Sequence, residues 1–212
     1  MFHPTINICC LPWINMHYYH DHKIKTSEQV YKPAEDSLLL ADNQLVEEGD
    51  TVLDMGTGTG LQAIIASDTA SCVLAVDVNP LALKLAEENA GLNKAGNIEF
   101  RESNLFRNIK KKEKFNLILF NPPYLPVTGK NMLEKAWCGG VGGREVIDEF
   151  IREFKAYLEP RGGMQLVVSS LNNPGEVVEE LRKLGLGVEI TAEKKIAFEK
   201  LLLLSCFMHR NK

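Results

Sequence analysis

Strand-like and helix-like segments alternate along most of the chain, and this alternation constrains the fold more than any other feature of the sequence. Short apolar runs that predict strands occur at residues 51–55, 72–77, 97–101, 115–120 and 164–169. Patterns that predict helices occur at residues 34–46, 60–67, 80–92, 144–158 and 174–184. Such alternation predicts a single Rossmann-like α/β domain, with a mostly parallel sheet and helices on both faces. Two last strands, 188–192 and 201–207, have no helix between them, so we expect seven strands ending in an antiparallel hairpin.

The chain of 212 residues is long enough for one domain with a full hydrophobic core. We assign residues 28–212 to that domain. Residues 1–27 lack a clear period, and we expect them to form a flexible N-terminal arm. His17, His20, Asp21 and His22 in this arm would suit a metal site. We favour a mobile or substrate-covering arm over that alternative and predict no metal.

Charge and cysteine content bear on the partners and the cellular setting. The formal net charge is −4 and the pI is about 5.8, with one short lysine cluster at residues 110–114. We expect this cluster to be a solvated loop and expect no stable binding to nucleic acid. Five cysteines without C-x-x-C spacing, no signal peptide and no membrane-spanning run predict a cytoplasmic protein.

A glycine-rich turn, Asp-Met-Gly-Thr-Gly-Thr-Gly at residues 54–60, joins the first strand of the predicted sheet to a helix. Ligands bind at such turns, because glycine lets the backbone bend sharply and approach them. The pattern does not fit G-x-G-x-x-G, and no P-loop lysine follows. Asp54 would repel a pyrophosphate but suits a cationic amino group or sulfonium. S-adenosyl-L-methionine therefore fits better than NAD or ATP, with Gly56, Gly58 and Gly60 in its binding turn.

Two further polar residues follow predicted strands at the same edge of the sheet. Asp77 ends the second strand, where its carboxylate is placed to accept hydrogen bonds from two ribose hydroxyls. Asn104 follows the third strand, where its side chain could bind an adenine amine. A plain turn residue fits that position equally well.

The fourth predicted strand leads into Asn121-Pro122-Pro123-Tyr124. We expect this strand to lie beside the first, so that its end faces the reactive methyl group. The Asn121 side chain and the Pro122 carbonyl can both accept hydrogen bonds from one NH2 group, and Tyr124 offers a face for stacking. Two such acceptors would orient a planar nitrogen, favour its developing positive charge and discriminate against a hydroxyl. The run therefore predicts methylation of a planar amide or amino group.

These two runs together resemble the class I methyltransferases that modify planar NH2 groups. Two flanking runs, Val-Tyr-Lys-Pro-Ala-Glu-Asp-Ser at residues 30–37 and Ala-Trp-x-Gly-Gly-x-x-Gly-Arg-Glu at residues 136–145, are similar to the HemK-like branch. Within that branch the resemblance is to the archaeal and eukaryotic type that methylates the class I translation termination factor. It covers about residues 28–207 and implies that residues 28–212 form a methyltransferase domain.

The resemblance implies N5-methylation of the glutamine in the Gly-Gly-Gln tripeptide of a release factor. The cofactor contacts that it implies are Tyr31, Ser37, Asp54, Gly56, Asp77, Asn104 and Asn121. The substrate contacts that it implies are Asn121, Pro122, Pro123 and Tyr124. It also implies a small zinc-binding activator protein on the free edge strand at residues 97–101. Asn104 departs from the family, which usually has an acid there, and residues 1–27 have no counterpart in it.

Two other functions stay open at this point. An N6-adenine methyltransferase acting on DNA or RNA shares the Asn-Pro-Pro-Tyr run, but the acidic pI disfavours the basic channel it would need. A non-catalytic scaffold with the same fold is disfavoured because that run is intact. The glycine-rich segment 125–143 is longer than an ordinary connection, and we expect it to form a rim that admits a thin peptide.

Overall fold

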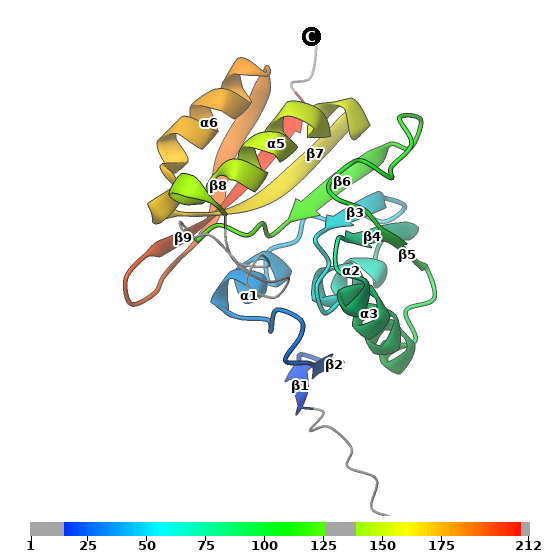
Figure 1. Cartoon of the computed structure of the whole chain (residues 1–212). Helices are drawn as coiled ribbons and strands as arrows, with labels where there is room; N and C mark the ends of the chain where they lie inside the picture. Colours follow the sequence, from blue (N-terminus) through cyan, green and yellow to red (C-terminus); the bar gives the residue numbers. More distant parts are fainter. Residues whose placement is uncertain (1–14, 126–138, 209–212) are drawn as a thin grey trace, which may run out of the picture.

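The computed structural model describes residues 15–125 and 139–208, which form an open twisted sheet with helices on both faces (Figure 1). The seven strands run in the order β5-β4-β3-β6-β7-β9-β8. The parallel strands are β3 (Thr51–Met55), β4 (Cys72–Asp77), β5 (Ile98–Glu102), β6 (Phe115–Phe120) and β7 (Leu158–Ser169). Strand β6 pairs with β3, as the sequence predicted, so the ends of these two strands lie side by side. The α/β class and the mostly parallel sheet are confirmed.

The last two strands are β8 (Leu186–Lys195) and β9 (Lys200–Met208). Strand β9 is antiparallel to both β7 and β8, which confirms the predicted C-terminal hairpin. Residues 201–206 of β9 are buried, because this strand lies inside the sheet while β8 forms its edge. Strand β5 forms the opposite edge.

The helices divide between the two faces of the sheet (Figure 1). One face carries α1 (Glu35–Ala41), α2 (Leu61–Ser67) and α3 (Pro80–Asn93). The other carries α5 (Glu145–Glu153) and α6 (Pro174–Lys183). Short 3-10 turns are η1 (Val141–Gly143), η2 (Phe154–Tyr157) and η3 (Ser170–Asn172). No helix within the two described ranges has the length and apolar character needed to cross a bilayer.

Two predicted helices are shorter than the sequence pattern indicated. The helix expected at 34–46 ends at Ala41, because the buried side chain of Gln165 binds the backbone that follows it. Gln165 donates to the carbonyl of Asn43 at 2.8 Å and accepts from the amide of Leu45 at 2.9 Å. This bidentate contact draws residues 43–45 onto the sheet instead of into another helical turn.

The helix expected at 144–158 ends at Glu153 and continues as the 3-10 turn η2. The apolar spacing of three residues suits a 3-10 turn as well as an α-helix, which is why the pattern did not distinguish them. Phe154 and Tyr157 stay buried through the turn, and the Tyr157 ring stacks on Phe106 with 4.4 Å between centroids. Leu158 already belongs to β7, which therefore begins six residues before the predicted strand at 164–169.

The N-terminal segment, where the sequence has no clear period, contains an antiparallel hairpin of β1 (Asn15–Tyr19) and β2 (His22–Thr26). Two asparagines of α3 bind the outer backbone of β2. Asn89 exchanges hydrogen bonds with the amide and carbonyl of Lys25 at 2.8 and 3.0 Å. Asn93 does the same with Lys23 at 2.8 and 2.9 Å. Residues 15–26 of the predicted arm thus form a hairpin that is bound to α3, and residues 1–14 lie outside the described part of the chain.

Two histidines of this hairpin, His20 and His22, each lie near an acid of the domain. His20 Nε2 lies 3.4 Å from Asp42, and His22 Nε2 lies 3.1 Å from Asp68. Across the described ranges, no group of three potential ligands could hold a metal ion. His20 and His22, two of the residues considered as joint metal ligands, thus lie near different acids.

Candidate active site

A cavity of about 560 Å³ opens at the carboxyl ends of β3, β4 and β6. Most of the residues predicted to contact cofactor or substrate line it, namely Tyr31, Ser37, Asp54, Gly56, Gly58, Asp77, Asn104, Asn121 and Pro123. Gly60, Pro122 and Tyr124 are not among the residues that line it, but each is next in sequence to one that does. The cavity therefore joins the glycine turn to the Asn-Pro-Pro-Tyr run in one space.

Asp54 is the most deeply buried charged group of the cavity wall, with an exposed fraction of 1%. One carboxylate oxygen accepts a hydrogen bond from the amide of Ala63 at 3.2 Å. Burial raises the pKa of Asp54 to about 7, because the charged form loses hydration. A cationic ligand group in the cavity would restore favourable interactions with the ionised carboxylate.

Asp77 holds the glycine turn as well as the cavity wall. Its Oδ2 accepts from the amide of Gly58 at 2.9 Å, and its Oδ1 accepts from the amide of Asn79 at 2.8 Å. Burial raises the pKa of Asp77, and these two amides oppose the shift. Each carboxylate oxygen can accept a second hydrogen bond, so the group is still able to bind hydroxyls of a ligand.

The three glycines of the turn have different surroundings, although all have positive φ, at 69°, 56° and 83° for Gly56, Gly58 and Gly60. Gly56 and Gly58 line the cavity. A Cβ on Gly60 would lie 3.0 Å from the Cβ of Ala86 in α3. Gly60 therefore serves the close approach of α2 and α3, and it lies between Thr59 and Leu61, which both line the cavity.

The two polar atoms of the Asn121 side chain differ in their hydrogen bonding. Its Nδ2 donates to the hydroxyl oxygen of Ser37 at 3.4 Å. Its Oδ1 is buried and has no hydrogen-bond partner within the described ranges. A buried acceptor without a donor is costly, so its persistence indicates a ligand with an N–H or O–H group.

Asp36 is a site residue that our sequence reasoning missed. It is 3% exposed and accepts hydrogen bonds from the Tyr31 hydroxyl at 3.0 and 3.2 Å and from the Ser37 amide at 2.6 Å. It also accepts from the Tyr124 hydroxyl. Burial and the nearby Asp36 charge raise the pKa of both tyrosines. The only sequence signal was its place in the run at 30–37, since the tyrosines meet it only in the folded chain.

Asn104 and Leu105 lie just after the carboxyl end of β5. Asn104 is exposed on the cavity wall, as a residue that contacts an adenine would be. Leu105, also on the wall, has a φ of +47° and is 7% exposed. A branched side chain is strained in this region of φ, and such strain is concentrated at functional sites. No sequence pattern indicated this conformation.

Of the glycine-rich segment 125–143, the structure describes Leu125 and residues 139–143. Gly140 and Glu145 line the cavity. Arg144 binds three acids, Asp148 at 2.7 Å, Glu176 at 3.1 Å and Glu180 at 2.9 Å, and so ties α5 to α6. Residues 126–138, which include Trp137 and most of the predicted rim, lie outside the described ranges.

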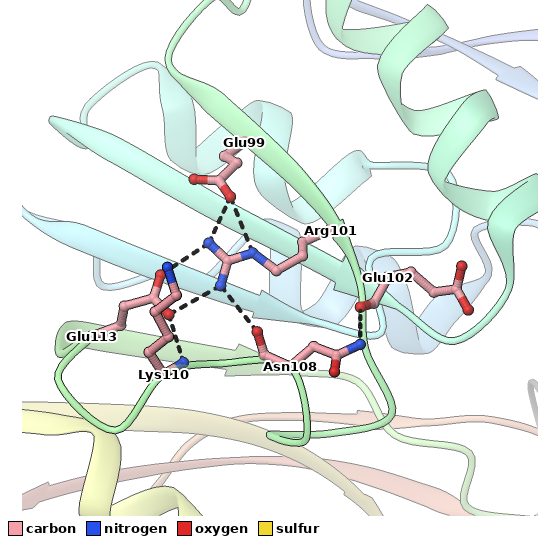
Figure 2. A network of polar contacts seen from close by, with 6 residues as sticks. All are labelled: Glu99, Arg101, Glu102, Asn108, Lys110 and Glu113. Atoms are coloured by element: carbon pink, nitrogen blue, oxygen red, sulfur yellow. Dashed lines mark hydrogen bonds and ion pairs between the residues drawn. The ribbon is translucent and has the colours of Figure 1, made fainter.

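The edge strand β5 carries a network of polar contacts (Figure 2). The Arg101 guanidinium donates to Glu99 at 2.6 Å and to both carboxylate oxygens of Glu113 at 2.9 and 3.0 Å. Asn108 donates to the carbonyl of Glu102 at 2.8 Å. These contacts hold the segment between β5 and β6 in place beside the β5 edge of the sheet. Within the described residues, β5 pairs only with β4.

An acid-led glycine turn and an Asn-Pro-Pro-Tyr run on adjacent strands, joined by one cavity, define a class I methyltransferase. The family model for the methyltransferase small domain matches residues 32–195. The chain belongs to this family.

Two named relatives are similar over most of their length. A Methanocaldococcus jannaschii protein with the name "Putative protein N5-glutamine methyltransferase" is 44% identical over 190 residues, which are 87% of this chain and 95% of the relative. The methyltransferase HEMK2 of Homo sapiens is 34% identical over 171 residues, which are 74% of this chain and 79% of the relative.

A solved structure is similar in fold and in sequence. It is the E. cuniculi Mtq2–Trm112 complex, described as responsible for methylation of the eRF1 translation termination factor. The match has a TM-score of 0.70 and 27% identity, and it covers 85% of this chain and 99% of that chain. The resemblance to HemK-like methyltransferases that the sequence indicated is confirmed.

Proposed function

We propose that this chain transfers a methyl group from S-adenosyl-L-methionine to the side-chain nitrogen of the glutamine in the Gly-Gly-Gln motif of a class I release factor. The observation that carries the proposal is the buried, unpartnered Oδ1 of Asn121 at the end of β6. A primary amide offers the N–H that this atom lacks. The names of the relatives, which include a protein N5-glutamine methyltransferase, support glutamine as the source of that amide.

The cavity fits the proposed cofactor on the chemistry of its own residues. Asp54 is a buried acid whose ionised form needs a cation, and an aminoacyl sulfonium carries one. Asp77 has acceptor capacity for ribose hydroxyls, and Asn104 lies on the wall beyond it. When bound, S-adenosyl-L-methionine supplies an electrophilic methyl group.

Asn121 and Pro122 would act on the substrate by orientation. An amide nitrogen is a weak nucleophile, because its lone pair is delocalised into the carbonyl. Acceptors at Asn121 Oδ1 and the Pro122 carbonyl would hold both N–H bonds, keep the nitrogen in line with the methyl group and stabilise the positive charge that develops. The proton is lost after transfer without a strong base. Tyr124 would wall the pocket, with its hydroxyl held by Asp36.

A second polypeptide is part of the proposal. We infer that a small zinc-binding activator adds a strand to the free edge of β5. The Mtq2 relative is found in complex with Trm112, and an exposed strand edge is a ready site for strand addition. The Arg101 network would keep β5 and the following segment in shape for such pairing.

Transfer of labelled methyl groups tests the proposal. The chain, with and without its activator, is incubated with labelled cofactor and either a release factor or duplex oligonucleotides. We expect label on the release factor and none on the oligonucleotides. Label on DNA or RNA alone would support adenine methylation instead, and label on neither, with cofactor bound, would support a scaffold.

Asn121→Ala provides the decisive variant. We expect kcat/KM to fall on the order of 100-fold or more, because an orienting acceptor is lost, while the cofactor Kd changes little. Asn116→Ala is the matched control, since Asn116 lies at the other end of β6 and its side chain only accepts from the Thr51 amide at 2.9 Å. Equal activity of the two variants would contradict the assigned role of Asn121.

A further inference from the structure

The run from Asn121 to Tyr124 is not held by the sheet. Ladder pairing of β6 ends at Phe120, which lies opposite Met55 and Leu166. Pro122 and Pro123 have no backbone N–H, so they cannot tie the run to its neighbours by donating hydrogen bonds. Its carbonyl groups must be restrained by donors from elsewhere in the chain.

Asn172 supplies such a donor. Its side chain is 1% exposed, at the end of the 3-10 turn that follows β7. The Nδ2 donates to the carbonyl of Tyr124 at 2.6 Å and to the carbonyl of Gly143 at 3.2 Å. The Oδ1 accepts from the backbone amide of Ser169 at 2.9 Å, which caps the turn. One side chain thus caps its own turn with one atom and holds two distant segments with the other.

A second glycine-rich turn, at residues 139–143, packs against the carbonyl of Tyr124. Gly143 has a φ of +70°, and a Cβ there would lie 2.1 Å from the carbonyl oxygen of Tyr124 and 2.4 Å from Asn172 Nδ2. The amide of Gly139 donates to the carbonyl of Leu125 at 2.8 Å. The backbone that follows the Asn-Pro-Pro-Tyr run is therefore enclosed between the 3-10 turn η3 and the glycine-rich turn at residues 139–143. Asn172 is hydrogen-bonded to both turns.

We propose that Asn172 is a positioning residue for methyl transfer, which acts by holding the carbonyl of Tyr124 and so fixing the amide acceptors Asn121 and Pro122. This proposal rests on the proposed function for the identity of the substrate. Asp36 holds the hydroxyl of Tyr124, so the residue is restrained at both its backbone and its side chain. A shift of the reacting atoms by about 1 Å can cost on the order of 100-fold in rate, which makes this restraint consequential.

Asn172→Asp isolates the positioning role. The substitution preserves the volume and the acceptor that caps Ser169, but it removes the NH2 that binds Tyr124 and Gly143. Asn93→Asp is the matched control. Asn93 also accepts one backbone amide, that of Lys23 at 2.8 Å, and donates to two carbonyls, at 2.7 and 2.9 Å, but on the N-terminal hairpin and α3.

The full chain, with its activator, is assayed for release-factor methylation, cofactor Kd and hydrogen exchange of the backbone. We expect Asn172→Asp to lower kcat/KM at least tenfold, with cofactor Kd within twofold of wild type and faster exchange in residues 121–125 and 139–145. Asn93→Asp should leave all three quantities within twofold. Equal kcat/KM in the two variants, or unchanged exchange in those segments, would overturn the proposal. A wild-type chain that methylates no release factor would refute the proposed substrate, and the exchange measurement would still decide whether Asn172 restrains the run.

Discussion

The carboxylate of Asp36 accepts the hydroxyl of Tyr31 at 3.2 Å on Oδ1 and 3.0 Å on Oδ2. Because the same carboxylate accepts the hydroxyl of Tyr124, it joins a residue of the cofactor cavity to the Asn-Pro-Pro-Tyr run. Ser37, next to it, accepts from Asn121. Two residues at the start of α1, Asp36 and Ser37, therefore hold side chains of both the cofactor cavity and the Asn-Pro-Pro-Tyr run.

Asp36→Asn is expected to lower the free energy of unfolding by about 2 kcal/mol, since one carboxylate oxygen is replaced by an NH2 that faces buried donors. Urea denaturation of the variant measures the loss. Glu35→Gln is the control, because Glu35 is half exposed and its pairing with Lys194 is a surface contact worth at most about 1 kcal/mol. If the two variants were equally stable, Asp36 would not brace the site.

Cofactor binding should be coupled to proton release at Asp54. Burial raises the pKa of this acid to about 7, so the protonated form prevails below that value in the ligand-free protein. In the unfolded chain the acid has its ordinary pKa of 3.8, so the stability of the ligand-free protein should fall as pH rises from about 4 to about 7 and level off above that value. A bound cation favours the ionised form, so cofactor affinity should rise over the same interval, by up to about tenfold per pH unit below the pKa.

Calorimetry in buffers of different ionisation enthalpy measures that released proton. Asp54→Asn should bind weakly and with little pH dependence near 7, which separates Asp54 from Asp77, whose pKa is also raised by burial. A wild-type affinity that does not change with pH would show that the cationic group of the ligand does not meet Asp54.

Gly60→Ala should destabilise the fold by about 2–4 kcal/mol. The positive φ of 83° disfavours a Cβ, and the Cβ would press on Ala86 in α3. Gly91→Ala in the same helix is the counterpart, since nothing lies within 4 Å of its Cβ and alanine favours helix. We expect that control to gain about 0.5–1 kcal/mol. Thermal unfolding compares them, and a neutral Gly60→Ala would mean that α2 and α3 can separate without cost.

The parts of the fold that sequence predicted are those governed by local patterns. The carboxyl ends of the parallel strands follow from the apolar runs in the sequence. The turn at 54–60 and the Asn-Pro-Pro-Tyr run follow from the spacing of their glycines and prolines. Neither needs knowledge of tertiary contacts. The end of α1 depends on Gln165, which reaches residues 43–45 only in the folded chain. The hairpin at 15–26 depends in the same way on Asn89 and Asn93 of α3.

The same distinction applies to the site. Asp54 and Asp77 lie at the carboxyl ends of β3 and β4, and Asn121 follows β6. The parallel sheet alone therefore brings them to one cavity. Asp36 and Asn172 act through the hydroxyl and the carbonyl of Tyr124, and neither has a neighbouring pattern that indicates this role. Gly60 has a packing role that the motif alone did not indicate, because a Cβ there would meet Ala86 of α3.

Mass spectrometry of the release factor after incubation with the enzyme, its activator and S-adenosyl-L-methionine tests the central claim most directly. Fragmentation of the peptide that contains the Gly-Gly-Gln motif locates the added group. We expect a single methyl group on the glutamine side chain, which is absent with Asn121→Ala enzyme and absent when that glutamine is replaced. A methyl group on any other residue, or an unmodified glutamine with wild-type enzyme, would contradict it.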